Sequence, residues 1–310
     1  MGSALLIRFR YLFVPGPTAH LRNDAKSRFD KSQLIAEIFG STNVGLIRHD
    51  NQDSFMIANL ETGDIATAEV PGLVSAHTAP FIIVVADGVG GAASGALASQ
   101  MAAEIILSEL HRWWHKVPKR DRESIEKMMR RVIEIANKSI HQKARESPEH
   151  HGMGTTTTLA LVLDGEAYIA QVGDSRAYLV RRSETTQITK DQSFVQRLID
   201  AGRMTRKEAE LSEHRNIILQ ALGPEEKVIT DLYHLRLESG DFLVLCSDGL
   251  SNQVSAEEIG RIVRGSSRPG EICDALIEEA MQSGAPDNVT VVIARVRTPE
   301  ADLQAAANRP

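Results

Sequence analysis

A two-strand hairpin near the middle of the chain is the feature that most restricts the fold. Two apolar runs, residues 155–163 and 166–172, are separated only by Asp164-Gly165. Asp-Gly between two such runs favours a type I′ turn and therefore a pair of antiparallel strands. Apolar, β-branched runs predict further strands at residues 54–60, 81–86, 177–181, 232–237, 242–246 and 289–296.

Helical patterns come in blocks between these strands. Apolar residues recur at three- and four-residue intervals in one helix that starts among residues 91–95 and in another over 122–143. Short helical pieces are expected within 193–222, and a further helix over 269–281. Strands joined mainly as hairpins, with the helices grouped, do not fit repeated strand–helix–strand units. The sequence therefore predicts an α+β fold, a layered sandwich with antiparallel sheets.

The two ends of the chain differ from this central part. Pro15-Gly16-Pro17 breaks any regular element, and residues 22–31 are mostly polar and charged. We expect residues 1–38 to form an N-terminal extension of unknown role, residues 39–298 to form one folded domain, and residues 299–310 to form a loose tail.

Charge and cysteine content exclude several classes of protein. There are 35 Lys and Arg against 41 Asp and Glu, a net charge of −6, whereas binding to nucleic acid or to anionic membranes favours a basic surplus. Cys246 and Cys273 lack any C-x-x-C partner, so neither a disulfide framework nor a thiolate zinc site is expected. No run approaches the ~18 apolar residues of a membrane span, and residues 4–14, interrupted by Arg8 and Arg10, make a poor signal peptide. We expect a cytoplasmic protein without nucleic-acid or membrane partners.

Aspartates mark the ends of the predicted apolar strands. They are Asp53, Asp87, Asp174, Asp248 and Asp287. A carboxylate at the mouth of a buried strand is costly to desolvate unless a cation compensates it. If the sheets bring these ends together, their repulsion requires a multivalent cation, and oxygen ligands alone select Mg²⁺ or Mn²⁺ over zinc. Asp-Gly is also an ordinary turn dipeptide. The residues by themselves therefore leave open whether Asp87-Gly88 and Asp248-Gly249 bind metal or only turn the chain.

Six short motifs occur in order along the chain. They are Gly45-Leu-Ile-Arg48-His-Asp-Asn-Gln52-Asp53, Val85-Ala-Asp87-Gly88-Val89-Gly-Gly, Met153-Gly-Thr-Thr156, Val172-Gly-Asp174-Ser-Arg176, Cys246-Ser-Asp248-Gly-Leu250 and Asp287-Asn288-Val-Thr290. In this order they resemble the successive motifs of the metal-dependent Ser/Thr protein phosphatases, the type 2C or PPM family, in its compact bacterial form. The resemblance runs from residue 42 to residue 296.

The resemblance implies a fold and a metal centre. The fold would be a four-layer α-β-β-α sandwich, two antiparallel sheets flanked by helices. Two Mn²⁺ or Mg²⁺ ions would lie at one edge, with the third, weaker ion of bacterial relatives beside them. The implied metal ligands are Asp87, which bridges both ions, the Gly88 carbonyl, Asp248 and Asp287 around the second ion, Asp53, which orients metal-bound water, and Asp174, which with Asp248 holds the third ion.

Further residues gain roles by the same resemblance. Arg48 would clamp the substrate phosphate, and Asn288 would support the centre from beside Asp287. A segment from residue 189 to residue 223 looks like the mobile flap of bacterial members. Its marked residues are Ser193, His214, Arg215 and Asn216.

The implied reaction is hydrolysis of phosphoserine and phosphothreonine on proteins. A metal-bridging water or hydroxide would attack phosphorus directly, with Arg48, Asp53 and Asp87 as the catalytic residues. The partners would be phosphorylated proteins and an opposing Ser/Thr kinase in the same pathway.

Two positions depart from the family pattern. Gln52 stands where many members carry Glu, and a neutral amide is a weaker cation ligand, so the second ion would be held through water. Val89 stands where eukaryotic members have His. The usual proton donor to the leaving oxygen is therefore absent, and a metal-bound water would substitute for it.

Three patterns allow other interpretations. The segment Gly88-Val-Gly-Gly-Ala-Ala93 loosely fits a dinucleotide-binding loop. Against it, Asp87 would then face a pyrophosphate without a cation, and the absence of a Walker lysine excludes a P-loop. His111 and His115, four residues apart on a helix, lack a third zinc ligand. The basic run over residues 112–131 fits a solvated helix face, with a docking surface for an acidic or phosphorylated partner as the alternative.

A catalytically silent, phosphatase-like binding module is the main alternative to an enzyme. Such a module would lack ligands. Asp87, Gly88, Asp248, Asp287 and Arg48 are all present, and this favours an enzyme.

Overall fold

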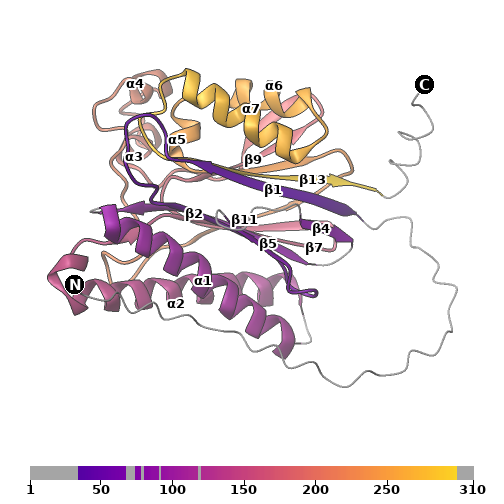
Figure 1. Cartoon of the computed structure of the whole chain (residues 1–310), viewed down its shortest axis with the longest axis horizontal. Helices are drawn as coiled ribbons and strands as arrows, with labels where there is room; N and C mark the ends of the chain where they lie inside the picture. The colour runs from indigo at the N-terminus through magenta and orange to yellow at the C-terminus, as the bar shows by residue number, and fades with distance from the viewer. Residues whose placement is uncertain (1–33, 68–73, 78–79, 91, 118–119, 299–310) are drawn as a thin grey trace, which may run out of the picture. The chain divides into compact units, whose positions relative to one another are not determined.

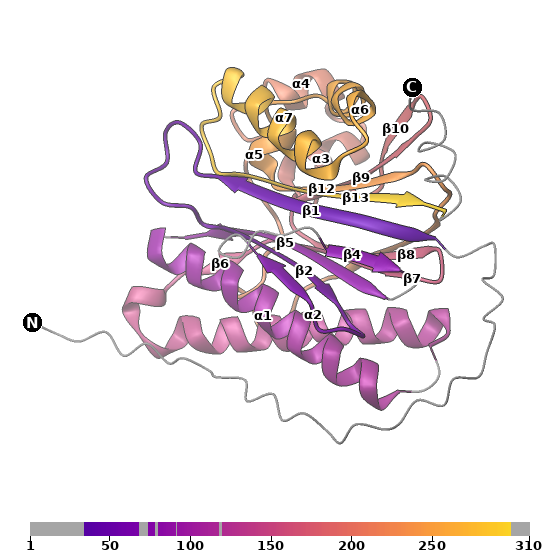
Figure 2. The same ribbon diagram turned by 45° about the vertical axis from the view of Figure 1, so that its right-hand side comes forward.

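The computed structural model describes residues 34–67, 74–77, 80–90, 92–117 and 120–298. These residues form two antiparallel β-sheets that pack face to face, with helices on both outer surfaces (Figures 1 and 2). The expected tail, residues 299–310, and residues 1–33 of the expected N-terminal extension lie outside the described residues.

The first sheet has six strands in the order β10-β9-β12-β13-β1-β4. They are β1 (Ile35–Asn43), β4 (Val74–His77), β9 (Arg176–Arg181), β10 (Glu184–Gln187), β12 (Phe242–Cys246) and β13 (Val289–Arg297). The second sheet has seven strands, in the order β11-β8-β7-β5-β2-β3 with β6 paired to β5. They are β2 (Asp53–Asn59), β3 (Ile65–Thr67), β5 (Phe81–Val89), β6 (Gly154–Thr155), β7 (Thr157–Leu163), β8 (Glu166–Val172) and β11 (Asp231–Arg236).

The predicted hairpin is confirmed as β7 and β8, which pair from Thr157↔Val172 to Leu163↔Glu166. Asp164 and Gly165 both have positive φ, 52° and 77°. A type I′ turn requires this at both central positions, and Asp and Gly tolerate it better than most residues.

Helices cover the two outer faces. The long helices α1 (Ala92–Lys116) and α2 (Arg122–Glu146) pack on the second sheet (Figure 2). The helices α5 (Asp248–Ser251), α6 (Ala256–Gly265) and α7 (Pro269–Gln282) cover the first sheet. The remaining helices are the 3₁₀ turn η1 (Pro148–His150) and the short α3 (Phe194–Asp200) and α4 (Arg206–Glu210).

Three apolar layers hold these elements together. Alternate residues of each strand face opposite sides. In β5, for example, Ile83 and Val85 enter the layer between the sheets, and Ile82 and Val84 enter the layer under α1 and α2. A third layer lies between the first sheet and α5–α7. The predicted α+β class with two antiparallel sheets and flanking helices is confirmed.

Strand β1 starts before the boundary expected at residue 39. Ile35 pairs with Arg297 on one side and with His77 on the other, and Ile35, Ala36 and Ile38 are buried. The intervening Glu37 forms an ion pair with Arg297 at 2.8 Å. Residues 35–38 therefore belong to the folded domain rather than to an extension.

Several short elements were not expected from the sequence. They are β3, β4, β6, β10, η1 and α5. The nine-residue strand β1 and the ten-residue helix α6 were not expected either. None of the described helices combines the length and the apolar character that crossing a bilayer requires.

Deleting residues 1–38 is expected to destabilise the domain relative to deleting residues 1–30. The longer deletion removes Ile35 and Ile38, and burial of one Ile side chain is worth about 1.5–3 kcal/mol. We expect the free energy of unfolding to fall by about 3–6 kcal/mol, measured by urea denaturation of the two truncated chains. Equal stability of the two would contradict the assignment of residues 35–38 to β1.

Candidate functional site

Five aspartates from both sheets meet at one edge of the sandwich. Asp53 and Asp87 lie directly opposite each other on the paired strands β2 and β5. Asp174 follows β8, Asp248 is the first residue of α5 after β12, and Asp287 lies two residues before β13. Asp87 is not at the end of its strand, because β5 continues to Val89 and pairs with β6.

Burial raises the pKa of four of these carboxylates, those of Asp53, Asp87, Asp174 and Asp248. Burial raises the pKa of Asp53 to about 7, although the Thr290 and Ser247 hydroxyls oppose the shift. Burial raises the pKa of Asp87 well above its usual range, and the charges of Asp53, Asp248, Asp174 and Asp287 raise it further. The charges of all four other carboxylates therefore act on Asp87.

The pKa values of Asp174 and Asp248 are raised as well. Burial and then the charge of Asp248 raise the pKa of Asp174 well above its usual range. Burial and then the charge of Asp287 raise the pKa of Asp248. The cluster thus concentrates negative charge that a nearby cation would stabilise.

The donor set fits a hard divalent cation. Asp53 Oδ2 accepts a hydrogen bond from Ser247 Oγ at 2.7 Å, whereas its buried Oδ1 has no hydrogen-bond partner. All the candidate ligands are oxygens, which suit Mg²⁺ or Mn²⁺ rather than zinc. The residues present therefore fit the expected metal.

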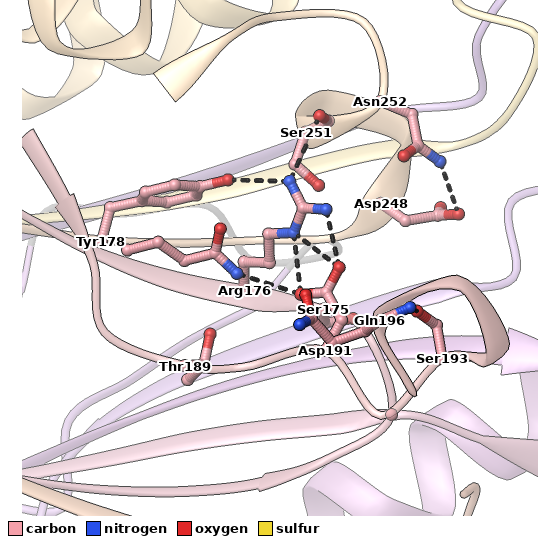
Figure 3. Close-up of polar contacts among 12 residues, drawn as sticks. Ser175, Arg176, Tyr178, Thr189, Asp191, Ser193, Gln196, Asp248, Ser251 and Asn252 are labelled. Carbon is pink, nitrogen blue, oxygen red and sulfur yellow. Dashed lines mark hydrogen bonds and ion pairs between the residues drawn. The ribbon is translucent and has the colours of Figure 1, made fainter. Parts of the chain in front are cut away.

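The side chains are not arranged as a closed ligand set. In the described part of the chain, no three His, Cys, Asp or Glu side chains already form a metal-binding group. Two of the aspartates have other partners: Asn252 Nδ2 donates to Asp248 Oδ2 at 3.0 Å, and Arg48 binds Asp287 (Figure 3 shows the first). An ion such as Mg²⁺ keeps several waters, so few direct protein ligands are sufficient.

Arg48 lies against this cluster. Its Nη2 is 2.7 Å from Asp287 Oδ2, and its side chain is 49% exposed. The hydrogen bond to Asp287 raises the pKa of Arg48, and the charges of Asp287, Asp87 and Asp248 add to the effect. The structure therefore pairs the residue expected to bind phosphate with a residue expected to bind metal.

Asn288 fixes the loop that carries Arg48. Its Oδ1 accepts from Gln52 N at 2.8 Å, and its Nδ2 donates to the carbonyls of Val44 and Asp50 at 2.9 and 3.0 Å. Gly45 adopts φ +79° at a point where a side chain would collide with the Asp287 carbonyl. The loop is thus tied to the start of β13.

Threonine and serine hydroxyls support the cluster, and sequence reasoning gave them no role. Thr156 Oγ1 accepts from Asp87 N at 3.0 Å, and Thr155 Oγ1 donates to Asp87 O at 2.9 Å. Ser247 Oγ binds Asp53 and also accepts from Thr290 N at 3.0 Å. Ser and Thr are common in strands and caps, so residue type alone does not identify a functional Ser or Thr in a sequence. Only the positions of Thr155, Thr156 and Ser247 within the ordered motifs could have pointed to them.

The expected flap residues separate into two groups. Ser193 is buried and caps α3, and it bridges to Ile218 at the far end of the segment. The His214 ring packs edge-on against Phe194, and Arg215 Nη1 donates to the Glu210 carbonyl at 3.2 Å. His214, Arg215 and Asn216 are exposed. Within the described residues, they make no hydrogen bond or ion pair with the five aspartates.

The two departures from the family pattern are direct neighbours of candidate ligands, since Gln52 precedes Asp53 and Val89 follows Gly88. The Gln52 amide is buried against α1, close enough to Gly95 that a side chain there would collide with it. Val89 ends β5.

The other patterns do not converge on this site. Gly88 lies within β5 and pairs with Thr155, so it is not part of an open glycine turn. The His111 and His115 rings pack edge to face at 4.5 Å. In the basic run, Arg130 donates to the Thr230 carbonyl at 2.6 Å.

Comparisons with known proteins identify the family of the chain and its fold. A family model described as Protein phosphatase 2C matches residues 50–282. The serine/threonine phosphatase stp of Listeria monocytogenes is 33% identical over 252 residues, which cover 81% of this chain and 92% of that protein. The structure of the S. agalactiae serine/threonine phosphatase has a TM-score of 0.73 at 31% identity, covering 84% of this chain and 99% of that one.

A further solved structure contains metal. It is the catalytic domain of the serine threonine protein phosphatase PstP in complex with two manganese ions. Its TM-score is 0.68 at 33% identity, covering 85% of this chain and 99% of that one. The family match, the relatives and the shared fold together show that the chain belongs to the protein phosphatase 2C (PPM) family of bacterial serine/threonine protein phosphatases.

Proposed function

We propose that the five aspartates and the Gly88 carbonyl hold Mn²⁺ or Mg²⁺, and that the protein uses them to dephosphorylate phosphoserine and phosphothreonine. Two ions would form the core centre, and a third, weaker one would lie at Asp174 and Asp248. The observation that carries the proposal is the convergence of five carboxylates from two sheets beside Arg48. Bound divalent ions would supply the Lewis acidity that activates water and neutralises the phosphoryl oxygens.

The protein supplies the positions of the reacting groups. Thr155 and Thr156 hold the Asp87 backbone. Ser247 binds one Asp53 oxygen, and the other, buried oxygen has no hydrogen-bond partner. Fixing these groups before substrate binds lowers the cost of reaching the reactive geometry. Asp87 and Asp53 therefore act as fixed anchors.

Arg48 would exchange partners when a phosphoprotein binds. A guanidinium presents a planar fork that matches two phosphate oxygens. Arg48 is half-exposed, and its partner Asp287 is itself a candidate metal ligand. Binding of phosphate to Arg48 would release Asp287 toward the cluster.

No side chain is needed as a nucleophile. Ser175, next to Asp174, is fully buried, and its Oγ lies 2.7 Å from Thr156 Oγ1. A buried hydroxyl in such a contact fits a structural role for Ser175 rather than attack on phosphorus. The reaction would then proceed without a phosphoenzyme.

The proposal extends to the setting of the enzyme. Substrates would be phosphorylated proteins, and a Ser/Thr kinase of the same pathway would oppose the reaction. Cys246 and Cys273 are both free and buried thiols, and this is consistent with a reducing cytoplasm.

Phosphate release from a phosphothreonine peptide is expected to require Mn²⁺ or Mg²⁺ and to stop with a chelator. Asp87→Asn should lower kcat by at least about a hundredfold, because it removes charge from the centre of the cluster. Asp164→Asn is the matched control, since the hairpin turn tolerates Asn. A folded protein that is inert with every metal would support the silent binding module instead.

Arg48→Ala is expected to raise the KM for the phosphopeptide roughly ten- to a hundredfold. A charge-assisted hydrogen bond is worth about 1.5–3 kcal/mol. Inhibition by inorganic phosphate should weaken in parallel. Arg112→Ala, which removes an exposed ion pair on α1, should change neither value. An unchanged KM in Arg48→Ala would rule out phosphate binding by this residue.

Asn288→Ala is expected to lower both stability and kcat/KM. It leaves Gln52 N and two carbonyls without their partner, which should cost about 2–4 kcal/mol of unfolding free energy. Asn59→Ala is the matched control. Asn59 is equally buried and accepts from the amides of Glu61 and Thr62 in a turn outside the site. We expect it to lose stability with kcat/KM intact, and equal losses of kcat/KM in both variants would contradict a specific role of Asn288.

A further inference from the structure

A sixth carboxylate, Asp191, lies beside the five that form the candidate site. After burial and the charge of Asp248, the charge of Asp191 is the next cause that raises the pKa of Asp174. It also raises the pKa of Asp248. The backbone places Asp191 there as well. Gln192, the next residue, pairs with Gly173, the residue before Asp174: Gln192 N donates to Gly173 O and Gly173 N donates to Gln192 Oε1, both at 2.9 Å. Asp191 therefore lies near the position of a cation held at Asp174.

Asp191 is fully engaged by other groups. Arg176 Nε lies 2.9 Å from Asp191 Oδ1 and 3.1 Å from Oδ2, and Arg176 Nη2 lies 2.6 Å from Oδ2 (Figure 3). Gln187 Nε2 donates to Oδ1 at 3.0 Å. Two donors on each oxygen leave Asp191 little capacity to bind anything else.

Arg176 is held in this orientation from its other side. Its Nη1 lies 3.2 Å from the Tyr178 hydroxyl and 3.5 Å from the Ser251 carbonyl at the end of α5. The Arg176 and Asp191 side chains are only 23% and 11% exposed. In Figure 3 the guanidinium lies between Tyr178, Ser251 and Asp191, with Asp248 on the adjoining turn.

The two charges of the pair act in opposite directions on the neighbouring site. Arg176 lowers the pKa of both Asp174 and Asp248, whereas Asp191 raises both. As ligands of a bound cation, Asp174 and Asp248 would supply two negative charges. An unpaired Asp191 would add a third, and an unpaired Arg176 would cancel one. The affinity of this position for a cation depends on which of these charges is compensated.

We propose that Arg176 is a positioning residue that binds Asp191 and keeps this sixth carboxylate out of the metal centre, so that the ion at Asp174 and Asp248 is held by two carboxylates and remains weakly bound. The inference rests on the proposed cation site at Asp174 and Asp248. A buried ion pair is often replaceable by apolar residues without loss of stability, so stability of the fold does not by itself require this pair.

Direct measurement of Mn²⁺ binding tests the proposal. Titration of the full chain, with free Mn²⁺ followed by electron paramagnetic resonance, gives the number of bound ions and the weakest Kd. Asp174→Asn identifies the relevant ion as the one that it removes. Urea unfolding without metal measures the structural cost of each variant separately.

The single variants are expected to shift this weakest Kd in opposite directions. Arg176→Met leaves Asp191 unpaired and should tighten binding roughly tenfold, and Asp191→Asn leaves Arg176 unpaired and should weaken it roughly tenfold. Arg176→Met with Asp191→Leu removes both charges and should return the Kd to within about threefold of the wild-type value. Arg176→Lys keeps the positive charge, and its Kd should also stay within about threefold of the wild-type value. If Arg176→Met does not fold, Asp191→Asn and the double variant still decide.

A purely structural role of the pair predicts a different pattern. Both single variants would then weaken Mn²⁺ binding in proportion to their loss of stability, and the double variant would not recover; this result would overturn the inference alone. If wild type and Asp174→Asn bind the same ions with the same affinities, the proposed cation site at Asp174 and Asp248 fails, and the inference fails with it.

Discussion

Mutual repulsion among the five aspartates is the constraint around which the rest of the site is built. Buried like charges are unfavourable, and the raised pKa values of Asp53, Asp87, Asp174 and Asp248 express that cost. The stability of the fold comes instead from three apolar layers that lie between and outside the sheets. Hydroxyls on neighbouring strands fix the acidic segments without neutralising them. The apolar layers and the hydroxyls thus hold together carboxylates that would otherwise repel one another.

Much of the fold could be predicted from local pattern, and the failures have definite causes. The hairpin of β7 and β8 could be predicted because two adjacent residues, Asp164 and Gly165, favour its turn. Strand β1 is less visible, because only Ile35, Ala36 and Ile38 mark its start and the polar Glu37 owes its place to Arg297, 260 positions away. The extension of β5 beyond Asp87 depends on pairing with β6, which follows two helices later. Local sequence carries no information about such distant partners. Helix α6 is different, since its cap Ser255 and its apolar residues are a readable signal.

The site divides in the same way. Aspartates at the ends of apolar strands could be identified from the sequence, and the ordered motifs related them to a family. What the sequence could not supply was the partner of each side chain. That Arg48 binds Asp287, and that Asp191 is bound by Arg176, follows from how loops from different strands meet at the sheet edge. Both are ion pairs between residues whose spacing in the chain fits no local motif.

The position of β13 has a consequence for how the enzyme comes into being. It is the last strand of the described chain, yet it lies inside its sheet, between β12 and β1, and it is preceded by Asp287 and Asn288. During synthesis on the ribosome, domains fold from the N-terminus onward. Until β13 has emerged, a nascent chain lacks a central strand of the first sheet, together with Asp287 and Asn288 just before it. Formation of the acidic cluster therefore depends on the late arrival of β13.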